Sequence, residues 1–212
     1  MTTTIPKKVA LVLASTRAVR AGPDVVDWVK KTLLASPASP KPEISIVDVK
    51  TFNLPVFNES IMPAMVPAYG QFEHAEIKAW SAAIEAFDAY IWVSPEYNFG
   101  VPGAVKNAID SLYNEWIGKP VLVVTYGIFG GASASESLQK TLNGMKLRVA
   151  ETRPKLEFSG WPDKSEMMSA AGGKIGPKTL EHWEAESKET LLKGFGELIE
   201  LLETPASAEK TA

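Results

Sequence analysis

The chain has 212 residues and contains no cysteine. This absence excludes disulfides, thiolate metal sites and a cysteine nucleophile. It also fits an intracellular protein, so we expect a cytoplasmic location. Histidine is nearly as rare, with only His74 and His182 present. Two histidines leave few parts for a histidine-based metal site or catalytic triad, and we expect no metal.

Long apolar runs and a strong excess of charge are also missing. No segment approaches the roughly 20 apolar residues that a membrane span requires. The apolar run that follows Lys7 and Lys8 ends at Ser15, too soon for a signal peptide. A net charge of -3 provides little attraction to nucleic acid. We therefore expect neither a nucleic-acid partner nor a membrane partner.

Apolar runs and helical patterns alternate along the chain. We expect strands over 8–14, 43–49, 88–94, 120–125 and 147–158, and helices over 23–34, 71–87, 102–113, 133–145 and 181–202. This alternation predicts a mainly parallel sheet with helices on both faces. Five strands favour a flavodoxin-like three-layer α/β/α fold with strand order 2-1-3-4-5. We expect one domain over residues 1–204 and a flexible tail over 205–212.

Ligands of such a sheet bind outside the carboxyl ends of the strands, so the loops there carry the functional prediction. The loop after the first strand, residues 14–22, contains Ser15, Arg17 and Arg20 just before a helix. Hydroxyls, guanidinium groups and a helix N-terminus together favour an anion such as phosphate. The loop has neither the GxGxxG nor the GK[ST] pattern. A helix cap flanked by solvated arginines is the alternative interpretation.

Two further loops are expected on the same rim of the sheet. Residues 94–103, SPEYNFGVPG, combine aromatic surface with prolines and glycines, a mixture that suits a planar heterocycle. Residues 125–133, TYGIFGGAS, hold three glycines, which permit close backbone approach to a ligand. Each loop could also be an ordinary turn before a helix. Together the three loops predict a site for a ligand with an anionic group and a planar ring.

The most specific motif is PEYN at 95–98, followed by PGAVKNAID at 102–110. It resembles the PEYN…PxxLKNAID signature of the NAD(P)H-dependent FMN reductase family, a flavodoxin-like group. The group includes bacterial chromate and quinone reductases and fungal quinone reductases, and the chain is most similar to the fungal type. The resemblance runs from about Val9 to Met145.

The resemblance implies an FMN cofactor and NAD(P)H as co-substrate. Ser15, Arg17 and Arg20 would hold the FMN phosphate or lie beside it. The residues expected along the isoalloxazine ring and near its other edge are Pro95, Glu96, Tyr97, Asn98, Phe99, Tyr126, Gly127, Gly130 and Gly131. Family members are commonly dimers or tetramers with the flavin near a subunit interface, so a homodimer or homotetramer is expected.

The implied activity is transfer of hydride from NAD(P)H to FMN, followed by reduction of quinones or similar small acceptors in a ping-pong mechanism. No side chain has to act as an acid or base, because the cofactor supplies the chemistry. A flavin-binding redox sensor or scaffold with little turnover is the alternative. Ile128 and Phe129 are apolar where the family has Gly and a polar residue. The role of residues 159–178 is left open.

Overall fold

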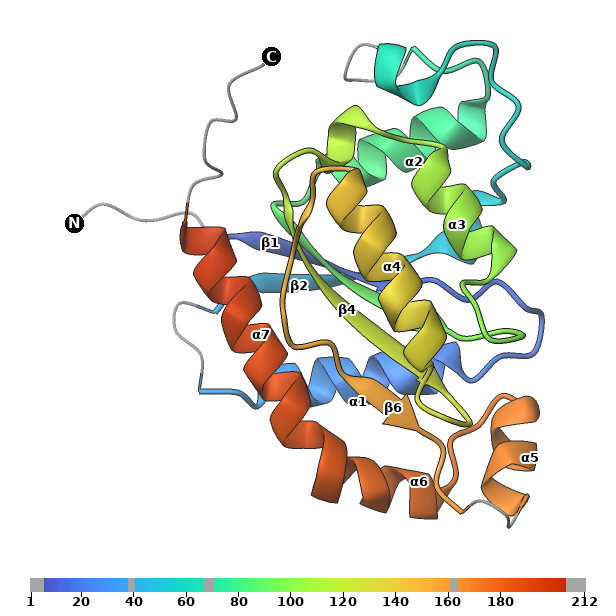
Figure 1. The fold of residues 1–212 in the computed structure, drawn as a ribbon, viewed down its shortest axis with the longest axis vertical. Coiled ribbons are helices and arrows are strands. Elements are labelled where there is room, and N and C mark those ends of the chain that lie inside the picture. The colour runs from blue at the N-terminus through green and yellow to red at the C-terminus, as the bar shows by residue number, and fades with distance from the viewer. Residues whose placement is uncertain (1–5, 38–40, 67–70, 161–163, 205–212) are drawn as a thin grey trace.

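The computed structural model describes residues 6–37, 41–66, 71–160 and 164–204, which form a parallel sheet between two layers of helices (Figure 1). The strands are β1 (Lys8–Leu13), β2 (Glu43–Asp48), β3 (Ala89–Pro95), β4 (Pro120–Gly127), β5 (Arg148–Val149) and β6 (Lys155–Glu157). Their order is β2-β1-β3-β4-β5, and β6 also pairs with β4. The predicted order 2-1-3-4-5 and the flavodoxin-like architecture are therefore confirmed.

The expected single strand over 147–158 is wrong, because this region forms two short strands. The chain leaves β4 after Ala150, whose N–H bonds the Val121 carbonyl at 2.9 Å, and rejoins it where Thr125 N–H bonds the Pro154 carbonyl at 3.0 Å. Between them Thr152 N–H donates to Glu197 instead, at 2.7 Å. Proline has no N–H to donate to a ladder. The break adds a sixth strand to the expected five.

Each face of the sheet is covered by its own set of helices (Figure 1). One face packs on α1 (Gly22–Leu34) and α7 (Lys188–Glu203), and the other on α2 (Ala75–Glu85), α3 (Gly103–Asp110) and α4 (Ala132–Gly144). Neighbouring residues of a strand point to opposite faces. Both faces are buried, which explains the continuous apolar runs in the sequence.

The remaining elements surround this core. The crossover after β2 contains the 3-10 turns η1 (Val49–Phe52) and η2 (Pro63–Met65), and η3 (Asn114–Trp116) follows α3. Residues 159–178, left open above, contain α5 (Ser165–Ala171). The expected helix over 181–202 starts earlier, in α6 (Pro177–His182), and reaches α7 through a π-helical turn (Trp183–Ser187). The expected tail over 205–212 lies outside the described residues.

Helix α7 approaches the sheet closely at Gly194. A side-chain carbon added there would lie 2.8 Å from Leu122 Cδ1 and 2.8 Å from the Thr152 carbonyl oxygen. At Gly196, on the same helix, the corresponding position has no neighbour within 4 Å. The two glycines therefore differ only in the space around them.

We predict opposite effects of alanine at these two positions. Gly194→Ala should lower the free energy of unfolding by about 1–3 kcal/mol, because overpacking forces the helix off the sheet. Gly196→Ala should raise it by about 0.5–1 kcal/mol, because alanine is the better helix former. Urea denaturation of both variants measures their free energies of unfolding. Equal effects would contradict the packing of α7 described here.

Candidate functional site

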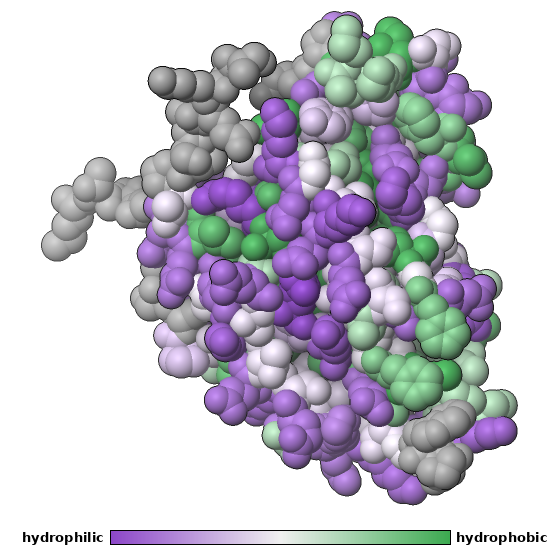
Figure 2. Space-filling view, viewed as in Figure 1, coloured by the Kyte–Doolittle hydropathy of each residue, from purple (hydrophilic) through white to green (hydrophobic). Residues whose placement is uncertain are grey.

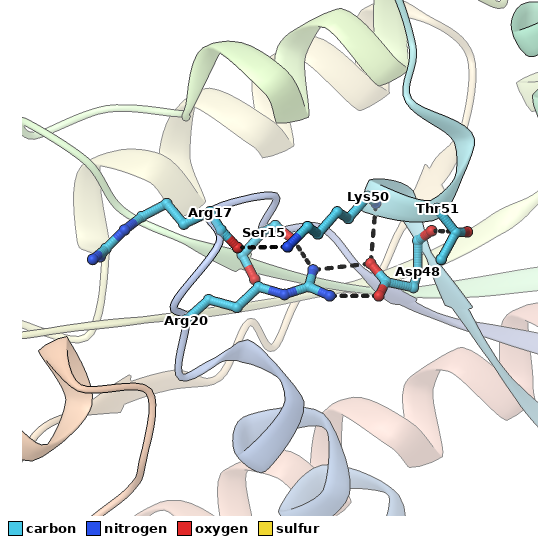
Figure 3. A network of polar contacts seen from close by, with 6 residues as sticks. All are labelled: Ser15, Arg17, Arg20, Asp48, Lys50 and Thr51. Atoms are coloured by element: carbon cyan, nitrogen blue, oxygen red, sulfur yellow. Dashed lines mark hydrogen bonds and ion pairs between the residues drawn. The ribbon is translucent and has the colours of Figure 1, made fainter.

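The loop after β1 is held in place by the guanidinium group of Arg20. This group donates to Asp48 at the end of β2, with Nη1 to Oδ1 at 2.9 Å and Nη2 to Oδ2 at 2.5 Å. It also donates to the backbone carbonyl of Ser15 (Figure 3). Hydrogen bonding to the Asp48 carboxylate raises the pKa of Arg20. Arg20 therefore ties the loop to the neighbouring strand, and Asp48 neutralises its charge.

Ser15 has a buried hydroxyl next to the start of α1. The residue is 1% exposed, and its Oγ has no well-formed hydrogen bond among the described residues. The Tyr126 hydroxyl lies beside it, and burial raises the pKa of Tyr126 while the Ser15 hydroxyl opposes that rise. Both groups lie close to Gly22, where an added side-chain carbon would collide with Ser15 Oγ and lie 3.0 Å from the Tyr126 oxygen.

Arg17 differs from Arg20 in its surroundings. Its side chain is exposed and points away from the pair formed by Arg20 and Asp48 (Figure 3). Burial raises the pKa of Tyr97, and the nearby Arg17 guanidinium partly opposes this rise. Lys50 Nζ donates to the Arg17 carbonyl at 3.4 Å, which adds a second cation at this loop. Arg17 is thus the arginine of this loop whose guanidinium is not taken by Asp48.

The loop after β3 forms a tight turn. Tyr97 and Gly100 exchange two backbone hydrogen bonds, both at 3.1 Å. The two residues between them, Asn98 and Phe99, have positive φ angles of 50° and 59°. Asparagine tolerates this conformation, whereas a bulky aromatic residue adopts it only at a cost. The Phe99 side chain is nevertheless 77% exposed, so the strain holds an aromatic ring out on the surface.

The loops after β3 and β4 are joined by Glu96. Its Oε2 accepts from Ala134 N–H at 2.9 Å, in the first turn of α4, where a carboxylate is favoured by the helix dipole. In the loop after β4, Gly130 and Gly131 leave no room for a side chain. A side-chain carbon at Gly130 would lie 2.9 Å from Lys155 Cβ, and one at Gly131 would lie 2.9 Å from Thr125 Cβ. Gly127, in contrast, has only contacts of 3.9 Å.

A pocket of about 190 Å³ lies among these loops. Its walls include seven of the predicted residues: Arg17, Arg20, Pro95, Glu96, Tyr97, Tyr126 and Gly127. The other five predicted residues, Ser15, Asn98, Phe99, Gly130 and Gly131, belong to the same loops but do not line it. Ile128, which the sequence marked as an apolar departure from the family, also lines the pocket, and five lining residues were not predicted: Ala21, Phe158, Met167, Ala170 and Ala171. For the last three, the apolar i, i+3, i+4 spacing in α5 was the available signal.

The loop after β1 offers the donors that a phosphate monoester needs. Ser15 provides a buried hydroxyl without a partner among the described residues, and Arg17 provides a guanidinium group. Helix α1 starts at Gly22 without a side-chain cap. Pro23 has no N–H and Val25 N–H bonds the Ala21 carbonyl, so the first turn offers the N–H groups of Gly22 and Asp24. Of this loop, Arg17, Arg20 and Ala21 line the pocket, and Ser15 lies behind them next to Tyr126. The aromatic residues Tyr97, Tyr126 and Phe158 line other parts of the pocket. The residues present therefore fit a flavin mononucleotide.

Comparison with known families shows which family the chain belongs to. Residues 7–154 match the family described as NADPH-dependent FMN reductase. This chain belongs to that family. It is accordingly an oxidoreductase with FMN as its flavin and NAD(P)H as its electron donor, as the PEYN…KNAID resemblance implied.

The similar proteins agree with the family. The chain is 44% identical over 201 residues to the NAD(P)H-dependent FMN reductase ntnL of Nectria sp, covering 93% of this chain and 98% of that protein. It is 32% identical over 162 residues to the quinone reductase of Escherichia coli K12, covering 74% and 76%. An oxidoreductase structure from Corynebacterium diphtheriae superposes with a TM-score of 0.64 at 15% identity, covering 93% and 97%, which shows the shared fold.

Among residues 6–37, 41–66, 71–160 and 164–204, no group of three His, Asp or Glu side chains is arranged to hold a metal ion. No helix in that part of the chain has the length and apolar character of a membrane span.

The strained turn at Phe99 generates a prediction about stability. Phe99→Gly and Phe99→Ala both remove the exposed ring, but only glycine adopts the positive φ angle without cost. We expect the free energy of unfolding of the glycine variant to exceed that of the alanine variant by about 1 kcal/mol. Thermal denaturation of both variants in the absence of FMN measures the difference. An alanine variant as stable as the glycine variant would contradict a strained Phe99.

Proposed function

We propose that this enzyme transfers two electrons from NAD(P)H through FMN to quinones or similar small acceptors in a ping-pong mechanism. The similarity to a quinone reductase supports this acceptor class. FMN supplies the redox chemistry by accepting electrons from one substrate and passing them to the other. In a ping-pong sequence, the oxidised nucleotide leaves before the acceptor binds in the same place.

The loop after β1 would hold the FMN phosphate. Arg17 and the Ser15 hydroxyl would donate to the phosphate oxygens together with the first N–H groups of α1, where the helix dipole favours an anion. Arg20 would lie beside the phosphate and maintain the shape of the loop, since its guanidinium already binds Asp48 and the Ser15 carbonyl. The single observation that carries this assignment is the buried Ser15 hydroxyl without a protein partner among the described residues.

The loops after β3 and β4 would position the isoalloxazine ring. Residues Pro95–Phe99 would pass along the ring, and residues 126–131 would lie near its other edge. Glu96 would act indirectly, because its carboxylate is bound to the first turn of α4 and so fixes one loop against the other. Gly127 leaves room for the cofactor, and no acid or base residue is required.

Arg17→Ala tests the phosphate assignment. We expect the FMN dissociation constant to rise about 10- to 100-fold, because a hydrogen bond between charged groups contributes about 1.5–3 kcal/mol. The affinity for riboflavin, which has no phosphate, should stay unchanged. Flavin fluorescence titration measures both constants.

The matched control is Arg148→Ala, at the opposite end of the sheet, where Arg148 pairs with the first residue of β4. An unchanged FMN affinity in Arg17→Ala would remove Arg17 from the site. The activity itself is tested by steady-state oxidation of NADPH with a quinone at several fixed concentrations. Intersecting rather than parallel double-reciprocal lines would contradict the ping-pong mechanism.

The chain would assemble as a homodimer or homotetramer through the crossover after β2. This segment exposes several large apolar side chains: Val56 at 85%, Ile61 at 50%, Met62 at 66% and Met65 at 70%. Apolar side chains gather at the upper right of Figure 2, where Figure 1 places this segment. A groove of about 810 Å³ lies between this segment and α3. Exposed apolar patches of this kind mark protein–protein interfaces. The cytoplasmic location stays a prediction.

Charge introduced into this patch tests the assembly. Met62→Glu with Met65→Glu should convert the oligomer into a monomer, because two carboxylates would have to be buried without partners. The control is Leu34→Glu, which changes an exposed apolar residue at the end of α1, outside the patch. Light scattering coupled to gel filtration gives the mass in solution. A monomeric wild-type protein, or an oligomeric double variant, would contradict this interface.

A further inference from the structure

Helix α5 closes one side of the flavin pocket. Its residues Met167, Ala170 and Ala171 lie on one face and line the same pocket as Arg17 and Tyr97. Met167 is half-buried there, and Ala170 is 7% exposed. The next residue in the chain, Met168, is 64% exposed and does not line the pocket. Met167 thus faces the pocket, whereas the adjacent Met168 faces solvent.

The segment that follows α5 is docked on the loop expected to hold the phosphate. A side-chain carbon added at Gly173 would lie 3.4 Å from the backbone oxygen of Arg20, so the two backbones are in contact. Ile175 N–H donates to Asp24 Oδ2 at 3.1 Å, and Lys174 Nζ lies 3.3 Å from Asp24 Oδ1. Asp24 belongs to the first turn of α1. These contacts join α5 to the flavin loop itself.

The other side of α5 is fixed by Glu166. This side chain is buried at 6% exposure, and its Oε2 accepts from Thr179 N–H at 2.9 Å in the first turn of α6. Helix α5 is therefore held from two directions, by α6 and by the start of α1. The match to the family model ends at residue 154, before α5 begins. This wall of the pocket comes from a part of the chain that the family model does not describe.

We propose that α5 is a fixed wall of the flavin site and that Met167 provides an apolar contact that slows the release of FMN, an inference that rests on the proposed function. A pocket of about 190 Å³ is smaller than the roughly 300–1,000 Å³ of sites that enclose a whole drug-sized ligand. It would enclose the part of the flavin beside Tyr97, Tyr126 and Phe158, and α5 would supply an apolar contact there. A thioether packs well against the face or edge of an aromatic ring system.

The two adjacent methionines provide a matched test. In Met167→Ala, we expect the FMN dissociation rate and dissociation constant to rise roughly five- to tenfold, because much of a buried Met contact is lost. Riboflavin should be affected by the same factor, since the wall does not touch the phosphate. Met168→Ala should leave both flavins unchanged. Flavin fluorescence after rapid dilution measures release without any turnover.

Replacing Asp24 distinguishes a structural role in holding α5 from a direct effect of its charge on phosphate binding. Asp24→Ala removes a negative charge from the first turn of α1, and charge alone would tighten the binding of a phosphate there. If the segment 173–175 holds α5 in place, the same variant should release FMN faster than the wild type. Tighter or unchanged binding in Asp24→Ala would overturn the docked wall.

A conservative variant and a turnover measurement complete the test of Met167. Met167→Leu keeps a similar apolar volume and should restore slow release, which distinguishes a lost contact from a misfolded helix. Wild-type enzyme passed through gel filtration should retain its FMN and reduce a quinone without added flavin. Equal release rates for Met167→Ala and Met168→Ala would overturn the proposal while leaving FMN as the cofactor. Failure of the wild type to bind FMN would instead contradict the phosphate site.

Discussion

The ion pair between Arg20 and Asp48 shapes the cofactor site more than any other contact. It connects the loop after β1 to the end of β2, two segments that are adjacent only because these strands pair in parallel. The same guanidinium bonds the carbonyl of Ser15, which fixes the backbone around the Ser15 hydroxyl. One arginine is neutralised in this way, and Arg17 keeps the charge that an anionic ligand requires.

The rest of the site is arranged around this fixed loop by contacts between elements distant in sequence. Glu96 joins the loop after β3 to the first turn of α4, and Tyr126 brings the end of β4 beside Ser15. Asp24 connects the start of α1 to the chain that follows α5. Each contact is made by a polar or small residue at the carboxyl rim of the sheet. The site is therefore assembled from many loops and not carried by one motif.

The sequence predicted the strand order and the three loops well, because buried parallel strands are apolar on both faces and hard to mistake. It failed in the region 147–158, where the ladder is interrupted between Ala150 and Pro154 and Thr152 N–H bonds Glu197 of α7 instead. It predicted Gly130 and Gly131 near the flavin, and only the structure shows that a side chain at either position would meet Lys155 of β6 or Thr125 of β4.

The amino-acid sequence by itself determined the layered parallel architecture, the rim on which the ligand binds and, through PEYN…KNAID, the flavin reductase family. Local propensity and motif spacing suffice for these properties. Only the tertiary structure decided which arginine is engaged by Asp48, and that α5 contributes Met167 to the pocket. Such contacts join residues far apart in the sequence, as Asp24 and Lys174 are at 150 positions, and no local pattern indicates them.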